Sequence, residues 1–181
     1  MLNKKMAQGL NDQINKEMYS AYLYMSMSAC SNQNGLKGFA NWFMVQYHEE
    51  MFHAMKLYEY VQRQGEEVKL EAIKAPPAEF SSQLDMFTQT LAHERYITSS
   101  INDLMEMAIK KKDHATQIFL EWYITEQVEE EENDNDIIAQ LKLIGDNVHA
   151  LLMLDRELSA RAATIPTDFS KGVEAAAKAA A

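Results

Sequence analysis

Glu49-Glu50-Met51-Phe52-His53 is the stretch that decides the fold, and it lies late in a helical segment expected over residues 36–64. Glu50 and His53 are three positions apart, so they project from the same face of a helix. The other residues on that face are mainly apolar or aromatic, as at Phe43. A carboxylate and an imidazole are costly to bury without partners. The motif alone therefore leaves two interpretations, a helix edge that reaches solvent and a buried polar site.

Three further helical segments also place a carboxylate or an amide within an apolar stripe. These residues are Glu17 in the first segment, Glu94 in the third, and Gln127 and Glu130 in the fourth. Gln127 follows Glu94 at the separation at which Glu50 follows Glu17, 33 residues, so the second pair of helices repeats the first. Unrelated polar residues would not be expected to share this spacing by chance. We therefore expect four helices to direct these groups to one point inside a bundle.

Composition and charge limit the class of protein. The 181 residues fit one domain with a sizeable core. A net charge of −10 argues against sequence-independent binding of nucleic acid, which needs a basic surface. The single cysteine, Cys30, excludes an internal disulfide framework, and no apolar run approaches the ~20 residues of a membrane span. Residues 1–10 lack the apolar region of a secretory signal. We therefore expect a cytoplasmic protein with no nucleic-acid partner and no membrane partner.

The first two helices are expected over about Lys5–Asn32 and residues 36–64, joined by the tight turn at Asn34-Gly35. Residues 65–81 break the helical pattern, and Pro76-Pro77 excludes a helix there. At about 3.3 Å per residue this segment reaches ~56 Å, whereas helix two is ~44 Å long. The segment is therefore long enough to cross over and to let helix three run parallel to helix two. A flexible linker between two domains is the other interpretation.

Capping residues delimit the remaining helices. Ser82 begins helix three as an N-cap, and Lys110–Lys112 suits its C-terminus. Asp113 is a good N-cap for helix four, which we expect to run to Ile144. A fifth helix of roughly Val148–Ala162 is too short and too apolar to stand alone, so it must pack on the bundle or on another subunit. The predicted class is all-α, a four-helix bundle with a long crossover between helices two and three and a short fifth helix.

Carboxylate oxygens combined with a single imidazole favour iron or manganese over metals that prefer thiolates. Two ions would have to share a ligand, and Glu50 is the candidate bridge because it lies between the two half-sites. The other candidate ligands are Glu17 and His53 for one ion, and Glu94 with Gln127 or Glu130 for the second. Since Gln127 is neutral where a symmetric site would have a carboxylate, we expect one tight site and one weaker, exchangeable site.

A third acidic site is predicted beside the first two. Its candidate ligands are Glu49, Glu126, Glu129 and Glu130. A solvated run of charge at residues 129–132 is the other interpretation. Tyr24 follows Glu17 by seven residues on the same stripe, so it is expected near the ions, where its phenol is able to donate an electron. A core tyrosine with a satisfied hydroxyl is the alternative there.

These motifs resemble the ferritins, most closely the bacterial non-haem ferritins. The resemblance covers about residues 1–165, taken as one ferritin-like di-iron domain, and leaves residues 166–181 as a C-terminal tail with an Ala-rich end. It implies a cage of 24 subunits that stores iron, in which Fe(II) is oxidised with dioxygen or hydrogen peroxide and kept as a ferric mineral. The implied ligands are Glu17, Glu50, His53, Glu94 and Gln127 for two irons and Glu49, Glu126, Glu129 and Glu130 for a third, with Tyr24 as a redox-active tyrosine.

The chain departs from related families at specific positions. In ferritin-like di-iron proteins two helices each carry a Glu-x-x-His motif, whereas this chain has Gln127-Val128-Glu129-Glu130 on its fourth helix. Met51 falls where bacterioferritins ligate haem, but without the second Glu-x-x-His the sequence does not favour haem. Phe52 and Met55 replace inner-surface carboxylates of animal ferritins, and the route by which iron enters stays open. A rubrerythrin-type di-iron oxidase or peroxidase and a metal-free structural bundle are the alternative functions.

Overall fold

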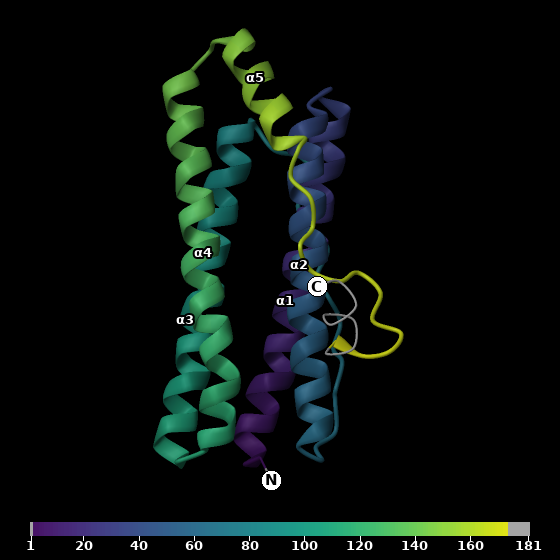
Figure 1. The fold of residues 1–181 in the computed structure, drawn as a ribbon, viewed down its shortest axis with the longest axis vertical. Helices are drawn as coiled ribbons and strands as arrows, with labels where there is room; N and C mark the ends of the chain where they lie inside the picture. The colour runs from purple at the N-terminus through teal and green to yellow at the C-terminus, as the bar shows by residue number, and fades with distance from the viewer. Residues whose placement is uncertain (1, 174–181) are drawn as a thin grey trace.

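The computed structural model describes residues 2–173, which form five α-helices and no strand. The helices are α1 (Lys4–Gln33), α2 (Lys37–Arg63), α3 (Gln83–Lys111), α4 (His114–Ile144) and α5 (Val148–Leu158). Figure 1 shows α1 to α4 as four long rods, with α5 descending from the end of α4 toward α2. The predicted bundle is confirmed. None of the described helices combines the length and the apolarity needed to cross a bilayer.

The ends of the four long helices lie where the capping residues predict them, within one residue. The Ser82 side chain accepts a hydrogen bond from the backbone N–H of Asp85 at 3.0 Å. Asp113 accepts from the N–H of Thr116 at 3.1 Å. Gly35 follows α1 with φ +77°, a left-handed conformation that glycine adopts at no steric cost. Local sequence therefore accounts for the end of α1 and for the starts of α3 and α4.

The predicted end of the fifth helix was wrong, because α5 ends at Leu158 and not at Ala162. Asn41 of α2 explains the difference. Its Nδ2 donates to the backbone oxygens of Leu158 at 3.2 Å and Arg161 at 2.8 Å. These two bonds hold the backbone in a turn against α2 directly after Leu158, so the chain leaves the helix there.

The crossover lies against α1, which confirms the crossover topology over the flexible linker. At one end, Asn11 donates to the oxygen of Glu67 at 3.2 Å and accepts from the N–H of Lys69 at 2.7 Å. Further along α1, Ser26 donates to the oxygen of Pro77 at 2.6 Å. The segment is thus fixed along about 22 Å of α1 at 1.5 Å per residue, and α3 consequently runs parallel to α2 (Figure 1).

Two apolar clusters fill the bundle, one at each end, with a polar layer between them. Leu10, Ile14, Leu57, Ile97 and Tyr123 belong to the cluster near the start of α1. Phe39, Phe43, Phe87, Ile137 and Leu154 belong to the cluster near α5. Each long helix leaves one cluster and enters the other through a stretch of buried polar residues. These are Glu17, Gln46, Glu50, His53, Glu94, Gln127, Glu130 and Asp134. The two clusters therefore hold the polar layer at mid-height.

The fifth helix packs on its own bundle. Asp155 accepts hydrogen bonds from the N–H groups of Gly38 at 2.7 Å and Phe39 at 3.0 Å, so it satisfies the free donors at the start of α2. Leu154 and Leu158 are buried in the same contact. A Cβ on Gly38 would lie 1.5 Å from the backbone oxygen of Asp155, so only glycine permits this approach.

After α5 the chain runs back along α2. The ring of Phe169 lies 6.4 Å from that of Phe52, and the N–H of Val173 donates to Glu59 at 2.7 Å. Residues 166–173 of the predicted tail therefore contact the bundle. The Ala-rich end of the tail, residues 174–181, lies outside the described residues. The division of the chain at residue 166 stays a prediction.

Candidate metal centre

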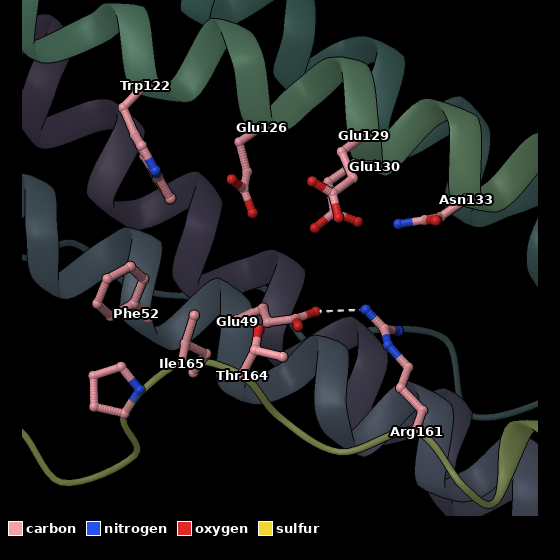
Figure 2. Close-up of a pocket in the computed structure, with 11 residues that line it drawn as sticks. Glu49, Phe52, Trp122, Glu126, Glu129, Glu130, Asn133, Arg161, Thr164 and Ile165 are labelled. Carbon is pink, nitrogen blue, oxygen red and sulfur yellow. Dashed lines mark hydrogen bonds and ion pairs between the residues drawn. The ribbon is translucent and has the colours of Figure 1, made fainter. Parts of the chain in front are cut away.

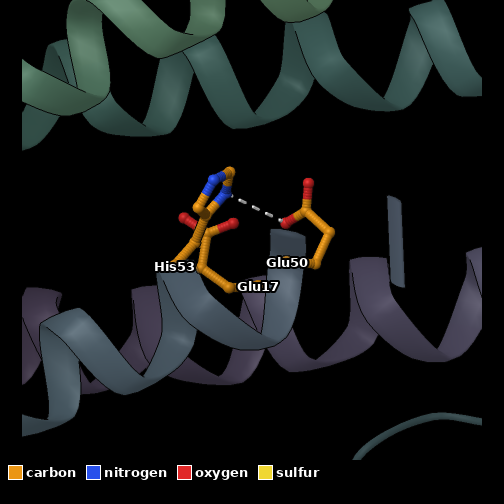
Figure 3. Close-up of side chains that lie close together, drawn as sticks. All are labelled: Glu17, Glu50 and His53. Atoms are coloured by element: carbon orange, nitrogen blue, oxygen red, sulfur yellow. Dashed lines mark ion pairs between the residues drawn. The ribbon is translucent and has the colours of Figure 1, made fainter. Parts of the chain in front are cut away.

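Three predicted ligands from two helices meet in the polar layer. Glu17 of α1 and Glu50 and His53 of α2 each offer a ligand atom, and these atoms all lie within 4.8 Å of one another. His53 Nδ1 is 3.6 Å from Glu50 Oε2 (Figure 3). Each of the three residues is 1% exposed. We call this group the first site.

The ligand atoms of the first site lack hydrogen-bond partners. Glu17 Oε2, both carboxylate oxygens of Glu50 and His53 Nε2 are buried without one. Buried polar atoms are nearly always paired, so a concentration of unpaired acceptors needs an explanation. A cation supplies one, because it would satisfy carboxylate oxygens and an imidazole nitrogen together. Gln13 donates to the other oxygen of Glu17 at 2.9 Å and thereby orients this carboxylate.

The second half of the centre is more fully hydrogen-bonded. The Tyr24 hydroxyl donates to one oxygen of Glu94, and Gln127 Nε2 donates to the other at 3.0 Å. Glu130 accepts from Gln46 at 2.8 Å. An ion that takes both oxygens of Glu94 must therefore displace the bonds they already accept. This half differs from the first site, whose oxygens are mostly free.

The buried carboxyl groups bind protons strongly when no cation is present. Burial, followed by the charge of neighbouring carboxylates, raises the pKa of Glu130 to about 8. Burial also raises the pKa of Glu50 and of Glu94. Burial opposes protonation of His53, but the carboxylates of Glu50 and Glu126 raise its pKa above the usual value. Metal ligands must be deprotonated, so a cation that enters this layer replaces protons.

The predicted third site is a pocket of about 390 Å³ beside the first site (Figure 2). Glu126, Glu129 and Glu130 of α4 line one side of this pocket, and Glu49 of α2 lies across from them; we call it the acidic pocket. Ligand atoms of His53, Glu126 and Glu130 lie within 4.8 Å of one another, so the pocket adjoins the first site directly. Thr164, Ile165 and Pro166, from the segment after α5, also line the pocket. The pocket thus brings together all four residues predicted for a third ion.

Comparison with known proteins identifies the family. A model of the ferritin-like domain matches residues 7–144. The chain belongs to the ferritin family. It is 43% identical over 161 residues to the bacterial non-heme ferritin of Staphylococcus epidermidis, which covers 89% of this chain and 97% of that one. The corresponding protein of Staphylococcus saprophyticus is 44% identical over the same length. The open pore ferritin of Archaeoglobus fulgidus superposes with a TM-score of 0.89 at 49% identity, covering 90% of this chain and 100% of that chain.

In this ferritin the predicted residues fall into three groups. Glu17, Glu50 and His53 form the first site, and Glu49, Glu126, Glu129 and Glu130 line the acidic pocket. Glu94, Gln127 and Tyr24 are joined to one another by hydrogen bonds through Glu94. The fold therefore brings each predicted residue into the polar layer or its margin. Their assignment as iron ligands stays a prediction.

Sequence reasoning missed one buried carboxylate, Asp134. It is 1% exposed and both of its oxygens lack a hydrogen-bond partner. Burial, then the charges of Glu94 and Glu130, raises its pKa to about 9. The signal was present, because Asp134 lies four residues after Glu130 and three before Ile137 on the buried stripe of α4. The surrounding run of acidic and amide residues made it look like part of a solvated face.

The other residues that sequence reasoning missed support the ligands and do not belong to the acidic motifs. Gln13 donates to Glu17 from the preceding turn of α1. Gln46 donates from α2 to Glu130 of α4. Arg161 pairs with Glu49 from beyond α5, with Nη2 2.8 Å from Oε2. Only the tertiary fold places Arg161 there.

Proposed function

We propose that this ferritin stores iron, that it oxidises Fe(II) at paired sites inside each subunit, and that it keeps the product as a ferric mineral within a shell of 24 subunits. The observation that carries the proposal is the first site, where buried ligand atoms of Glu17, Glu50 and His53 converge without hydrogen-bond partners. The relatives named bacterial non-heme ferritin support the same function. Fe(II) and dioxygen or hydrogen peroxide are the proposed substrates, and the cytoplasm is the proposed location.

Each residue of the centre has a proposed role. Glu50, neither of whose oxygens accepts a hydrogen bond, bridges the two irons, and Glu17 and His53 complete the first of them. Glu94 holds the second iron, and Gln127 or Glu130 supports it. This second position is the weaker and more exchangeable one, because the oxygen of Glu94 that takes the iron must first give up the bond from Gln127, while the other oxygen keeps the bond from Tyr24.

Tyr24 is proposed to supply one electron when the oxidant is reduced. Its hydroxyl donates to Glu94, so that carboxylate can accept the phenolic proton as the electron leaves the ring. The products are a neutral tyrosyl radical and a protonated Glu94, while the oxidant gains the electron. Burial, then the nearby carboxylates, raises the pKa of Tyr24, so the phenol keeps its proton until the oxidation occurs.

An Fe(II) titration tests storage. The iron-free protein is loaded with Fe(II) without oxygen, exposed to air and desalted. We expect far more than two irons per chain in a soluble ferric core. Retention of only two irons would overturn storage and favour an oxidase or peroxidase that acts on another substrate.

Variants test where the oxidation takes place. Glu50→Ala is expected to slow the rapid oxidation of Fe(II) by at least tenfold, because both irons lose a shared ligand. Glu106→Ala is the matched control, since Glu106 is exposed on α3 and pairs with Lys110 at 3.6 Å. Oxidation by Glu50→Ala at the wild-type rate would refute the assigned site.

A further inference from the structure

A positive charge already occupies part of the acidic pocket. Among the described residues that line it, Arg161 is the only basic one. Its Nη2 lies 2.8 Å from Glu49 Oε2, across the pocket from Glu129 and Glu130 (Figure 2). This distance is typical of a charge-assisted hydrogen bond. One of the four carboxylates available to a third ion is therefore already neutralised by the chain itself.

The fold fixes the position of this guanidinium. Its carbon lies 4.7 Å from the ring centre of Trp42, within the range of a cation–π contact. The backbone oxygen of Arg161 accepts from Asn41 at 2.8 Å. The side chain is 23% exposed, and its Nη1 is buried without a hydrogen-bond partner. The charge is thus held at the pocket, but only one of its two terminal nitrogens has a protein acceptor.

The segment that carries Arg161 is anchored on both sides. Asn41 holds it at the end of α5, while Phe169 against Phe52 and Val173 on Glu59 hold it beyond the pocket. The backbone that carries Arg161 is thus fixed beside the pocket, whereas its guanidinium is held by one hydrogen bond to Glu49 and by the ring of Trp42.

We propose that Arg161 is a built-in competitor that sets the affinity of the acidic pocket for metal ions. An incoming ion must separate Glu49 from the guanidinium before it gains that carboxylate, and it meets a like charge as it approaches. When the ion leaves, the guanidinium takes Glu49 again. The pocket therefore passes iron onward instead of retaining it. The inference rests on the proposed function, because it assumes that the acidic pocket is a third ion site.

Arg161→Gln tests the proposal, with Tb(III) as the probe because it is a hard cation that carboxylate oxygens bind. Crystals of the assembled, iron-free protein are soaked in graded Tb(III). The anomalous signal is then measured separately in the acidic pocket and at the first site. We expect Arg161→Gln to lower the half-saturating concentration at the pocket by about tenfold, as when one charge-assisted hydrogen bond no longer competes. Occupancy at the first site should change less than twofold.

Two further variants separate charge from packing. Arg161→Lys keeps the charge and is expected to bind Tb(III) within about threefold of wild type. If it binds as tightly as Arg161→Gln, charge is not the cause and the proposal is overturned. Arg156→Gln removes one positive charge from an exposed position on α5 and should leave the pocket unchanged. An equal gain in this control would show a general charge effect and would also overturn the proposal.

The outcomes distinguish this inference from the proposed function. Equal affinity of wild type and Arg161→Gln for Tb(III) at the pocket would refute the role of Arg161 and leave the third site standing. Absence of Tb(III) from the pocket in both proteins, with the first site occupied, would refute the third site and the inference with it. Iron gives a second readout, since at a free Fe(II) concentration below saturation of the pocket more Fe(II) ions should be bound per chain in Arg161→Gln.

Discussion

Replacing Asp134 by Asn measures what the unpaired carboxylate costs the iron-free bundle. Asp134 is buried on α4, and neither oxygen has a hydrogen-bond partner. The pKa of the carboxyl group is raised from 3.8 to about 9, first by burial and then by the nearby carboxylates of Glu94 and Glu130. Asn removes the ionisable group at nearly constant volume, so the change in stability reports mainly on the charge.

The sign follows from proton binding in the two states. In the unfolded chain Asp134 ionises above about pH 4, whereas in the folded chain it holds its proton until about pH 9. The folded state therefore binds one more proton in this window, and the free energy of unfolding falls by about 1.4 kcal/mol per pH unit as pH rises. At pH 7 the accumulated cost is about 4 kcal/mol, and relaxation of the interior reduces it to about 2–4 kcal/mol. Below pH 4 the cost disappears.

Thermal unfolding of the iron-free protein at pH 5, 7 and 8.5 tests this account. We expect Asp134→Asn to raise the Tm by about 5–15 °C at pH 7, at 2–4 °C per kcal/mol for a chain of this size. The gain should be smaller at pH 5 and larger at pH 8.5. Asp136→Asn is the matched control, because Asp136 is exposed two residues further along α4 and surface substitutions usually change stability by less than about 0.5 kcal/mol. A gain that does not grow with pH, or a loss of stability, would refute the reasoning.

Three further predictions concern the polar layer and the contact of α5. Tyr24→Phe removes the donor to a buried oxygen of Glu94 and is expected to cost about 1–3 kcal/mol in denaturant unfolding, with exposed Tyr22→Phe as a neutral control; equal stabilities would argue against that bond. Gly38→Ala places a Cβ 1.5 Å from a backbone oxygen of α5, so hydrogen exchange should show α5 losing protection; unchanged protection would contradict the tight packing. Zn(II) binding at pH 7 should release protons, because burial raises the pKa of carboxyl groups such as that of Glu130 to about 8. Calorimetry in buffers of different ionisation enthalpy measures the release, and buffer-independent heats would exclude it.

The long helices could be predicted because their limits are local. Ser82 and Asp113 act as N-caps, and their side chains bond to backbone groups three residues away. The end of α5 could not be predicted in this way, because a residue of α2, Asn41, decides it. The course of the chain after α5 likewise depends on contacts with residues more than a hundred positions earlier, such as Glu59.

The first site could be predicted for a different reason than the limits of the helices. A carboxylate or an imidazole within an apolar helical stripe is easy to recognise in a sequence. Three residues occupy such positions: Glu17, Glu50 and His53. Asp134 lies at the same helical spacing, but its neighbours in the sequence are acidic, so the pattern did not distinguish it from a solvated helix face. Arg161 belongs to no periodic element, so no sequence pattern could have placed it at Glu49.

The asymmetry of the centre originates in the hydrogen-bond donors around the carboxylates. At the first site, Gln13 donates to only one oxygen of Glu17, and neither oxygen of Glu50 accepts a hydrogen bond. An ion that binds there displaces protons but breaks few hydrogen bonds. At the second half, Tyr24 and Gln127 together occupy both oxygens of Glu94, so an ion must replace one of these bonds even to gain a single oxygen. Since each hydrogen bond to a charged group is worth about 1.5–3 kcal/mol, the first site should fill first. The order of occupancy is then set by the donors around the carboxylates, although the carboxylates themselves are chemically alike.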